Sequence, residues 1–229
     1  MKGKLIGVGV GPGDPDLLTI KATKTLANAD IIALPQTKSS NVALDIAKEY
    51  IEDKELLYID TPMVKNQPKD GEVYQNAAKK IIECLDRGLD VAFITLGDPT
   101  IYSTYIYIHK LVQKASYDVS IVPGITSFSA AAALLNDSLC EAGESLHIIP
   151  ASYDGLEKQL DVPGNKVLMK SGKQLPHVIE ALKERDLLKG TTIVEKCSMP
   201  EEKVYHNEEE FNQANSYFSV LIVKEGDVK

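Results

Sequence analysis

Short apolar runs alternate with amphipathic segments over the first half of the chain. The runs are rich in aliphatic and β-branched residues, as in buried strands. They occupy residues 5–10, 30–34, 56–59, 91–96 and 119–122. Strands that alternate with helices predict a mostly parallel sheet with right-handed crossovers.

Helices are expected between these runs. Val73, Ala77, Ile81 and Leu85 recur every four residues, which places them on one helix face. Asp14 can cap a helix that has Pro15 in its first position, and a further helix is expected over Ile101–Lys114. Residues 61–71 carry two prolines and one glycine, so we expect an exposed loop there.

The alternation of predicted strands and helices ends after residue 125. A helix of small residues over Ser127–Leu135 and an amphipathic helix around Leu175–Leu182 are the only clear helices. Four further strands are expected, at residues 146–149, 167–169, 191–196 and 218–223. Fewer helices per strand predict a mixed, partly antiparallel sheet. We therefore expect an α/β protein of two domains, at residues 1–118 and 119–229.

Net charge and hydropathy argue against a nucleic-acid partner and against a membrane span. The chain of 229 residues carries a net charge of −8, and its lysines are interspersed with acidic residues. A nucleic-acid partner is disfavoured because such proteins carry a basic patch or stripe. No run of roughly 18 apolar residues is present, so we expect no membrane span. Glycines interrupt the first apolar run too early for a signal peptide, and a cytoplasmic protein is expected.

The cysteines and histidines do not form a recognisable site. Cys84, Cys140 and Cys197 are far apart and lack the C-x-x-C spacing, which favours three reduced core cysteines. The histidines, at 109, 147, 177 and 206, are scattered, and metal binding requires ligands that converge. We expect no metal site. His109 stands out because it follows a Gly-Asp-Pro turn on the same predicted helix.

A glycine-rich segment, residues 7–14 (GVGVGPGD), joins the first strand to the first helix. The dinucleotide fingerprint G-x-G-x-x-G fails there, because its third glycine would fall on Pro12 or Asp14. No Gly-Lys-Ser/Thr follows, so the Walker pattern fails as well. Two interpretations stay open: a tight turn that requires glycine, or backbone left bare beside a ligand.

Two more turns follow predicted strands. Residues 97–99 (Gly-Asp-Pro) come after the fourth strand, and residues 123–127 (Pro-Gly-Ile-Thr-Ser) come after the fifth. Ligands of open α/β sheets bind at the carboxyl ends of the strands. Asp98 is therefore either the N-cap of a helix with Pro99 at its first position or a residue of a ligand site.

Taken together and in this order, the three turns resemble those of the tetrapyrrole (corrin/porphyrin) methylase family. The matching segments are residues 8–19 (VGVGPGDPDLLT), 96–102 (LGDPTIY) and 122–127 (VPGITS). Residues 95–105 (TLGDPTIYSTY) most resemble the branch that methylates C20 of precorrin-2 or cobalt-factor II. Uroporphyrinogen methyltransferases usually have a second glycine in place of Leu96 and Gly-Arg in place of Ser103-Thr104.

The resemblance implies an S-adenosylmethionine-dependent methyltransferase of porphyrin and cobalamin biosynthesis. It implies two α/β domains, a mostly parallel N-terminal sheet and a mixed C-terminal one, with the ligand cleft between them, and a homodimer. The tetrapyrrole is the implied substrate. The implied donor-binding residues are Pro12, Leu96, Gly97, Asp98, Ile101, Tyr102, Thr126, Ser127 and Met169. Residues 195–199 are implied on the adenine side.

The chemistry is an in-line methyl displacement, in which the enzyme mainly positions the two reactants. C20 must lose a proton after it accepts the methyl group, and Asp98 is the candidate base, unless its only role is to bind the donor. Lys170, Lys173 and Lys196 either pair with substrate carboxylates or lie solvated on the surface.

Other activities stay open. Within the family, the alternatives are methylation of another ring position and ribose methylation of ribosomal RNA, which the net acidity disfavours. Outside enzymes, the alternative is a non-catalytic S-adenosylmethionine-binding regulator. A nucleotide-dependent oxidoreductase fails on the missing fingerprint.

Overall fold

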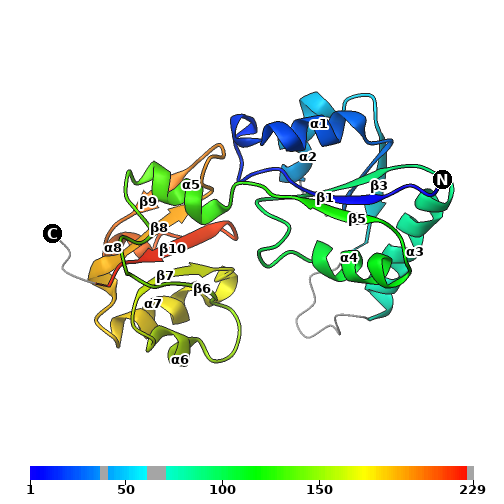
Figure 1. Ribbon diagram of the computed structural model, residues 1–229. Helices are drawn as coiled ribbons and strands as arrows, with labels where there is room; N and C mark the ends of the chain where they lie inside the picture. The colour runs from blue at the N-terminus through cyan, green and yellow to red at the C-terminus, as the bar shows by residue number, and fades with distance from the viewer. Residues whose placement is uncertain (37–40, 61–70, 226–229) are drawn as a thin grey trace. The chain divides into compact units, whose positions relative to one another are not determined.

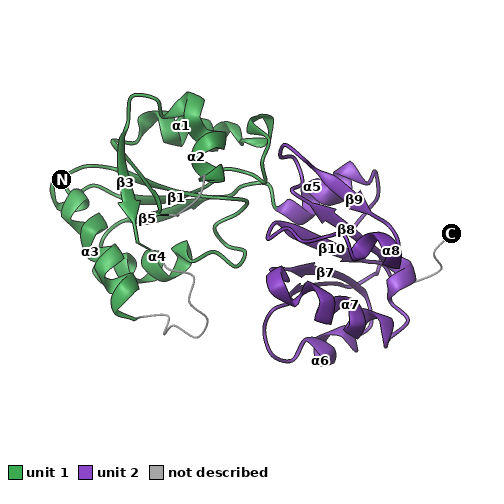
Figure 2. Ribbon diagram, turned by 180° about the vertical axis from the view of Figure 1, so that it is seen from behind, with its two compact units in different colours: residues 1–126 green, residues 127–229 purple. Residues whose placement is uncertain are grey.

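The computed structural model describes residues 1–36, 41–60 and 71–225, and these form two compact units that divide after Thr126 (Figure 2). We expected the division after residue 118. The first unit extends to Thr126 because the strand at 119–122 pairs with the first strand of the chain. The loop expected at residues 61–71 lies outside the described residues, apart from Gly71.

The first unit contains a five-stranded parallel sheet in the order β3-β2-β4-β1-β5, as the alternating pattern predicts. Its strands are β1 (Leu5–Gly9), β2 (Ile31–Pro35), β3 (Glu55–Ile59), β4 (Val91–Thr95) and β5 (Val119–Val122). Its helices are η1 (Pro15–Leu17), α1 (Ile20–Asn28), α2 (Val42–Ala47), η2 (Lys48–Tyr50), α3 (Glu72–Asp86) and α4 (Tyr105–Lys114).

Helices cover both faces of this sheet (Figure 1). Helices α1 and α2 pack one apolar cluster against one face, with Leu26 and Ile46 buried. Helices α3 and α4 pack a second cluster against the other, with Ile81 and Ile108 completely buried. β1 lies inside the sheet and all five of its residues are buried, which is why this run is apolar or glycine throughout.

Two helices begin later than expected. Asp14 caps only the short helix η1, and Thr19 caps α1 by accepting from the N–H of Ala22 at 3.1 Å. The helix expected at Ile101 begins at Tyr105, because Tyr102 has a φ of 49°, a left-handed conformation that interrupts a right-handed helix. The segment between Asp98 and α4 is therefore a turn.

The second unit contains a five-stranded mixed sheet in the order β6-β7-β10-β8-β9, as predicted. β6 and β7 are parallel, and the other pairs are antiparallel. The strands are β6 (Leu146–Pro150), β7 (Asn165–Met169), β8 (Thr191–Glu195), β9 (Lys203–Tyr205) and β10 (Ser219–Val223). The helices are α5 (Ser127–Leu134), α6 (Leu156–Leu160), η3 (Gly172–Gln174), α7 (Leu175–Lys183), η4 (Leu188–Gly190) and α8 (Glu208–Phe211).

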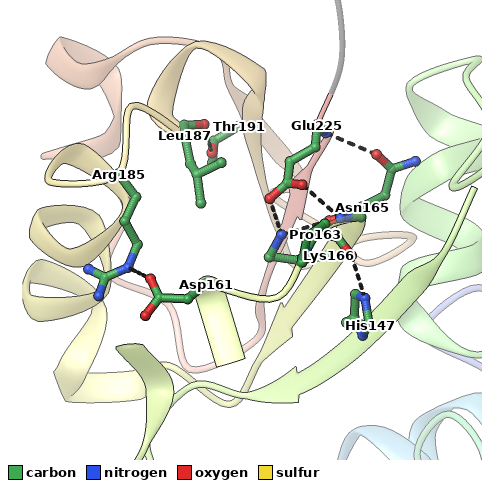
Figure 3. A network of polar contacts seen from close by, with 10 residues as sticks. His147, Asp161, Pro163, Asn165, Lys166, Arg185, Leu187, Thr191 and Glu225 are labelled. Carbon is green, nitrogen blue, oxygen red and sulfur yellow. Dashed lines mark hydrogen bonds and ion pairs between the residues drawn. The ribbon is translucent and has the colours of Figure 1, made fainter. Parts of the chain in front are cut away.

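A buried ion pair ties the end of β10 to the start of β7 (Figure 3). The Lys166 side chain is completely buried and pairs with Glu225, while Lys166 Nζ also donates to the carbonyl of Gly164 at 2.7 Å. The other Glu225 oxygen accepts from the N–H of Gly164 at 2.7 Å, and the Glu225 N–H donates to Asn165 at 2.9 Å. Although burial opposes it, the hydrogen bonds from Lys166 and Gly164 hold the pKa of Glu225 below its ordinary value.

All three cysteines are free, but only two lie in the core. Cys84 and Cys197 are buried, whereas Cys140 is exposed. The prediction of three core cysteines is wrong for Cys140 because it lies in the irregular segment between α5 and β6, outside any helix or strand. No described helix has the length and hydropathy of a membrane span. Within the described ranges, no three His, Cys, Asp or Glu side chains gather as a metal site.

Candidate functional site

The three glycine-containing turns follow three adjacent strands, β4, β1 and β5. A Cβ at Gly9 would lie 2.5 Å from the backbone nitrogen of Gly124 and 2.6 Å from the carbonyl oxygen of Gly97. No side chain fits within such distances. The ends of β1, β4 and β5 therefore meet backbone to backbone, and Gly9 is required by this approach.

A short antiparallel bridge joins the first two turns. The N–H of Gly97 donates to the Gly11 carbonyl at 2.7 Å, and the N–H of Gly11 donates to the Gly97 carbonyl at 3.3 Å. Pro12, which directly follows Gly11, is buried. The glycine-rich segment is thus held against the Gly-Asp-Pro turn. This contact would let both segments line one ligand site.

Asp98 joins the second turn to the third. One carboxylate oxygen accepts from the N–H of Gly124 at 2.9 Å. The other accepts from the N–H of Thr100 at 2.7 Å and from the Thr100 hydroxyl. Asp98 is only 8% exposed. The interpretation of Asp98 as the N-cap of a helix starting at Pro99 is wrong, because the helix begins at Tyr105 and the carboxylate caps a turn instead.

Gly97 borders open space. Its φ is 70°, and apart from its two chain neighbours no described residue has an atom within 4 Å of the position that a Cβ would take. Leu96 and Ile101 are half-buried on either side of this turn, and Tyr102 is exposed. Partial burial raises the pKa of the Tyr102 hydroxyl. The turn therefore presents bare backbone and apolar side chains, which fits the amino-acid part and the carbon chain beside the sulfonium of the expected donor.

The remaining expected donor residues lie at the division between the units and in the second unit. Thr126 ends the first unit, and Ser127 is the first residue of α5. Met169 is the last residue of β7, pairs with Val220, and accepts from the N–H of Ala151 at 2.8 Å. Ser127 and Met169 therefore belong to the second unit. The other expected donor residues share one sheet edge of the first unit, apart from Thr126 at its end: Pro12, Leu96, Gly97, Asp98, Ile101 and Tyr102.

The structure separates the three candidate lysines. Lys196 forms an ion pair with Glu201, and Lys173 is exposed. Lys170 is half-buried, and burial lowers the pKa of its ammonium group. Glu195, expected on the adenine side, points into the second unit and accepts from the N–H groups of Asn215 and Ser216 at 2.6 and 2.5 Å.

His109 lies away from these turns. Its Nδ1 contacts the hydroxyl of Tyr105 at 3.0 Å, and burial, aided by Lys110, lowers its pKa. The Tyr105 ring packs over the middle of β1, where a Cβ at Gly7 would lie 2.2 Å from the ring. Gly7 therefore serves the core, and only the later glycines of the segment belong to the turn.

Comparison with known proteins gives consistent results. Residues 4–211 match the family model of the tetrapyrrole (corrin/porphyrin) methylases. A probable cobalt-precorrin-2 C(20)-methyltransferase of Methanocaldococcus jannaschii is 37% identical over 227 residues, covering 96% of each chain. A precorrin-2 C(20)-methyltransferase of a Sinorhizobium species is 30% identical, covering 96% of this chain and 95% of the relative.

Solved structures share the fold. Uroporphyrin-III C-methyl transferase of Thermus thermophilus, complexed with S-adenyl homocysteine, superimposes with a TM-score of 0.75. The match covers 97% of this chain and 98% of that one, at 22% identity. At that identity the likeness concerns the fold alone.

Proposed function

This chain belongs to the tetrapyrrole (corrin/porphyrin) methylase family, and we propose that it methylates C20 of precorrin-2 or of its cobalt complex, cobalt-factor II, in cobalamin biosynthesis. The observation that carries the proposal is the 37% identity to a probable cobalt-precorrin-2 C(20)-methyltransferase along 96% of both chains. Within that alignment, residues 95–105 carry the motif that resembles the C20 branch.

The methyl donor is S-adenosylmethionine, which supplies an activated methyl group on a positively charged sulfur. Gly97 leaves space for it at the sheet edge, and the half-buried Leu96 and Ile101 offer apolar contact. Thr126, Ser127 and Met169 complete the proposed donor residues, together with Pro12 and Tyr102. Because the donor is already activated, the chain contributes chiefly by fixing the geometry of the displacement.

In the reaction, the bond from C20 to the methyl carbon forms as the bond from that carbon to sulfur breaks. C20 then releases its proton to water. Asp98 is the proposed site carboxylate, but its two oxygens already accept three hydrogen bonds from Thr100 and Gly124. This engagement supports a role in shaping the donor site more than a role as the base.

The test is incubation with donor labelled in its methyl group and either precorrin-2 or cobalt-factor II, followed by NMR location of the methyl carbon. We expect the label at C20. A label at another ring carbon would replace the proposal by another branch of the family. Donor binding in calorimetry without any methyl transfer would indicate the regulator instead.

Two further properties complete the proposal, one expected from the sequence and one implied by the family resemblance. We propose that the protein works in the cytoplasm and as a homodimer. Light scattering coupled to size exclusion tests the second point, and a mass of about 25.0 kDa, that of one chain, would contradict it.

A further inference from the structure

One edge of the second sheet gathers two tyrosines and a lysine that the donor site does not use. β6 and β7 are parallel, and β10 runs antiparallel to β7, so the ends of β6 and β7 meet the start of β10. Tyr153 follows β6, Lys170 follows β7, and Tyr217 precedes β10. Burial is the main cause of the raised pKa of Tyr217, and the nearby Tyr153 raises it further. The three side chains therefore belong to one sheet edge.

Lys170 differs from the other lysines at the ends of these strands. Lys166, on the same strand, is completely buried but pairs with Glu225 (Figure 3), and Lys196 pairs with Glu201. Lys170 is half-buried, and among the described residues none forms an ion pair or hydrogen bond with its ammonium group. Burial alone lowers its pKa. A cation that loses water without gaining an anion is unfavourable, unless a ligand supplies the anion.

The next residue, Ser171, also has a buried polar group without a partner among the described residues. Ser171 is 1% exposed, and its hydroxyl oxygen has no hydrogen-bond partner in the part of the chain that the structure describes. Buried hydroxyl groups are nearly always paired. Two adjacent residues in one turn thus lack the partners that their burial requires, and both bind carboxylate oxygens readily.

The two tyrosines supply apolar surface beside this turn. Tyr153 is 58% exposed and Tyr217 is 49% exposed, and Tyr217 packs edge-on against Phe218 with 5.3 Å between ring centroids. Aromatic rings combine a large apolar face with a polar tip. A cation flanked by aromatic faces matches a planar, unsaturated ring system that carries carboxylate side chains.

We propose that this edge is a binding site for the tetrapyrrole, in which Lys170 and Ser171 bind one of its carboxylate side chains while Tyr153 and Tyr217 pack against the macrocycle. The inference rests on the proposed function and deepens it, because it assigns residues that select a polycarboxylate substrate. No covalent step is involved. The alternative occupant is the carboxylate of the methyl donor, which the test separates.

The experiment compares Lys170→Met with Lys173→Met. Methionine keeps the length and apolar stem of lysine and removes the charge, and the exposed Lys173 is the matched control three residues further on. The probe is uroporphyrin III, a stable tetrapyrrole with eight carboxylates, followed by quenching of its fluorescence. Binding of S-adenosylhomocysteine is measured by calorimetry on the same samples.

We expect Lys170→Met to weaken uroporphyrin III binding about tenfold, the size of one charge-assisted hydrogen bond. S-adenosylhomocysteine affinity should stay unchanged, Lys173→Met should match the parent, and Lys170→Arg should recover most of the affinity. In methylation assays the loss should appear in KM rather than in kcat.

Three outcomes would overturn the inference. Lys170→Met could bind the probe as well as the parent, or lose S-adenosylhomocysteine affinity instead, or the parent could fail to bind the probe at all. The proposed function is judged separately, by donor binding and C20 methylation of the parent protein. A parent that methylates C20 together with an unaffected Lys170→Met variant would reject the Lys170 site and keep the activity.

Discussion

The carboxylate of Asp98 accepts a hydrogen bond from the backbone N–H of Gly124 at 2.9 Å, and this bond joins the turns that follow the two strands flanking β1. Gly9 sits between them with no room for a side chain. The edge where the donor is expected is therefore a rigid backbone assembly, held together by a residue that sequence motifs alone would assign to chemistry.

Asp98→Asn separates the roles that remain for this carboxylate. An amide has one acceptor oxygen, so its NH2 group must face either the N–H of Gly124 or the N–H of Thr100, and one of these buried donors loses its partner. We expect a loss of about 1–3 kcal/mol in the free energy of unfolding, measured in urea, because an unpaired buried polar group costs that much. Donor affinity should fall with it.

Single-turnover rates at saturating donor complete this test. If Asp98 only shapes the site, the rate at saturation should stay within a few-fold of the parent. A base should instead show normal donor affinity and a rate about 10²-fold lower or more. Unchanged stability, affinity and rate together would remove Asp98 from the site.

Gly97→Ala should impair donor binding. Apart from the chain neighbours of Gly97, the added methyl group meets no described atom within 4 Å, so it projects into the space expected to hold the donor. We expect at least about a tenfold loss of S-adenosylhomocysteine affinity in calorimetry, equal to 1.4 kcal/mol. The positive φ of 70° adds a stability cost of about 1 kcal/mol.

Gly88→Ala is the control for this backbone cost. Gly88 has a φ of 82° just after α3, at the opposite edge of the first sheet. It should lose at least as much stability, because a Cβ there would also lie 3.1 Å from the carbonyl oxygen of Met1, and it should keep full donor affinity. Equal affinity losses in the two variants would show that Gly97 matters only for folding.

The sequence predicted the sheets better than the turns. Nine of the ten described strands follow from apolar runs that are visible locally, and the mixed second sheet follows from the scarcity of helices. Short elements were missed, because α6, β9 and α8 have only three to five residues, fewer than a periodic pattern needs. The start of α4 was misplaced because its Gly-Asp-Pro turn has the composition of a helix cap.

Side-chain partners distant in sequence could not be predicted. Lys166 and Glu225 are separated by 59 residues, and a lysine in an apolar strand gives no sign of its anion. The same holds for Asp98, whose partner Gly124 lies 26 residues away. Likewise, Gly7 and Gly9 looked alike in sequence. Only packing shows that Gly7 makes room for the Tyr105 ring and Gly9 for the neighbouring turns.

Glu225→Gln should destabilise the second unit. It leaves the completely buried Lys166 without its anion, and removal of one partner from a buried pair usually costs 3–5 kcal/mol. Because the Glu225 side chain is 28% exposed, we expect a smaller loss of about 2 kcal/mol in urea unfolding. Glu208→Gln, which breaks the exposed pair with Lys183, should leave the urea midpoint almost unchanged, because solvent screens that pair.

A second variant decides whether the buried charge is the cause. Lys166→Met combined with Glu225→Gln removes both charges, and we expect it to be more stable than Glu225→Gln alone. If the double variant is the less stable one, packing of the lysine stem outweighs its charge.

Folding stability should fall as the pH drops through the range in which His109 titrates. Burial, aided by Lys110, lowers the pKa of His109 in the folded chain below its ordinary value of 6.5. The unfolded chain then binds more protons than the folded chain just below pH 6.5, so acid favours unfolding. Stability that is fully present above pH 6.5 is therefore lost as the pH falls through the folded pKa.

His109→Gln keeps a polar partner for the Tyr105 hydroxyl and cannot titrate. In urea unfolding between pH 7.5 and 5.5, above the range of most carboxylates, this variant should show a shallower dependence on pH than the parent. An identical slope for His109→Gln and the parent would mean that His109 titrates alike in the folded and unfolded chains.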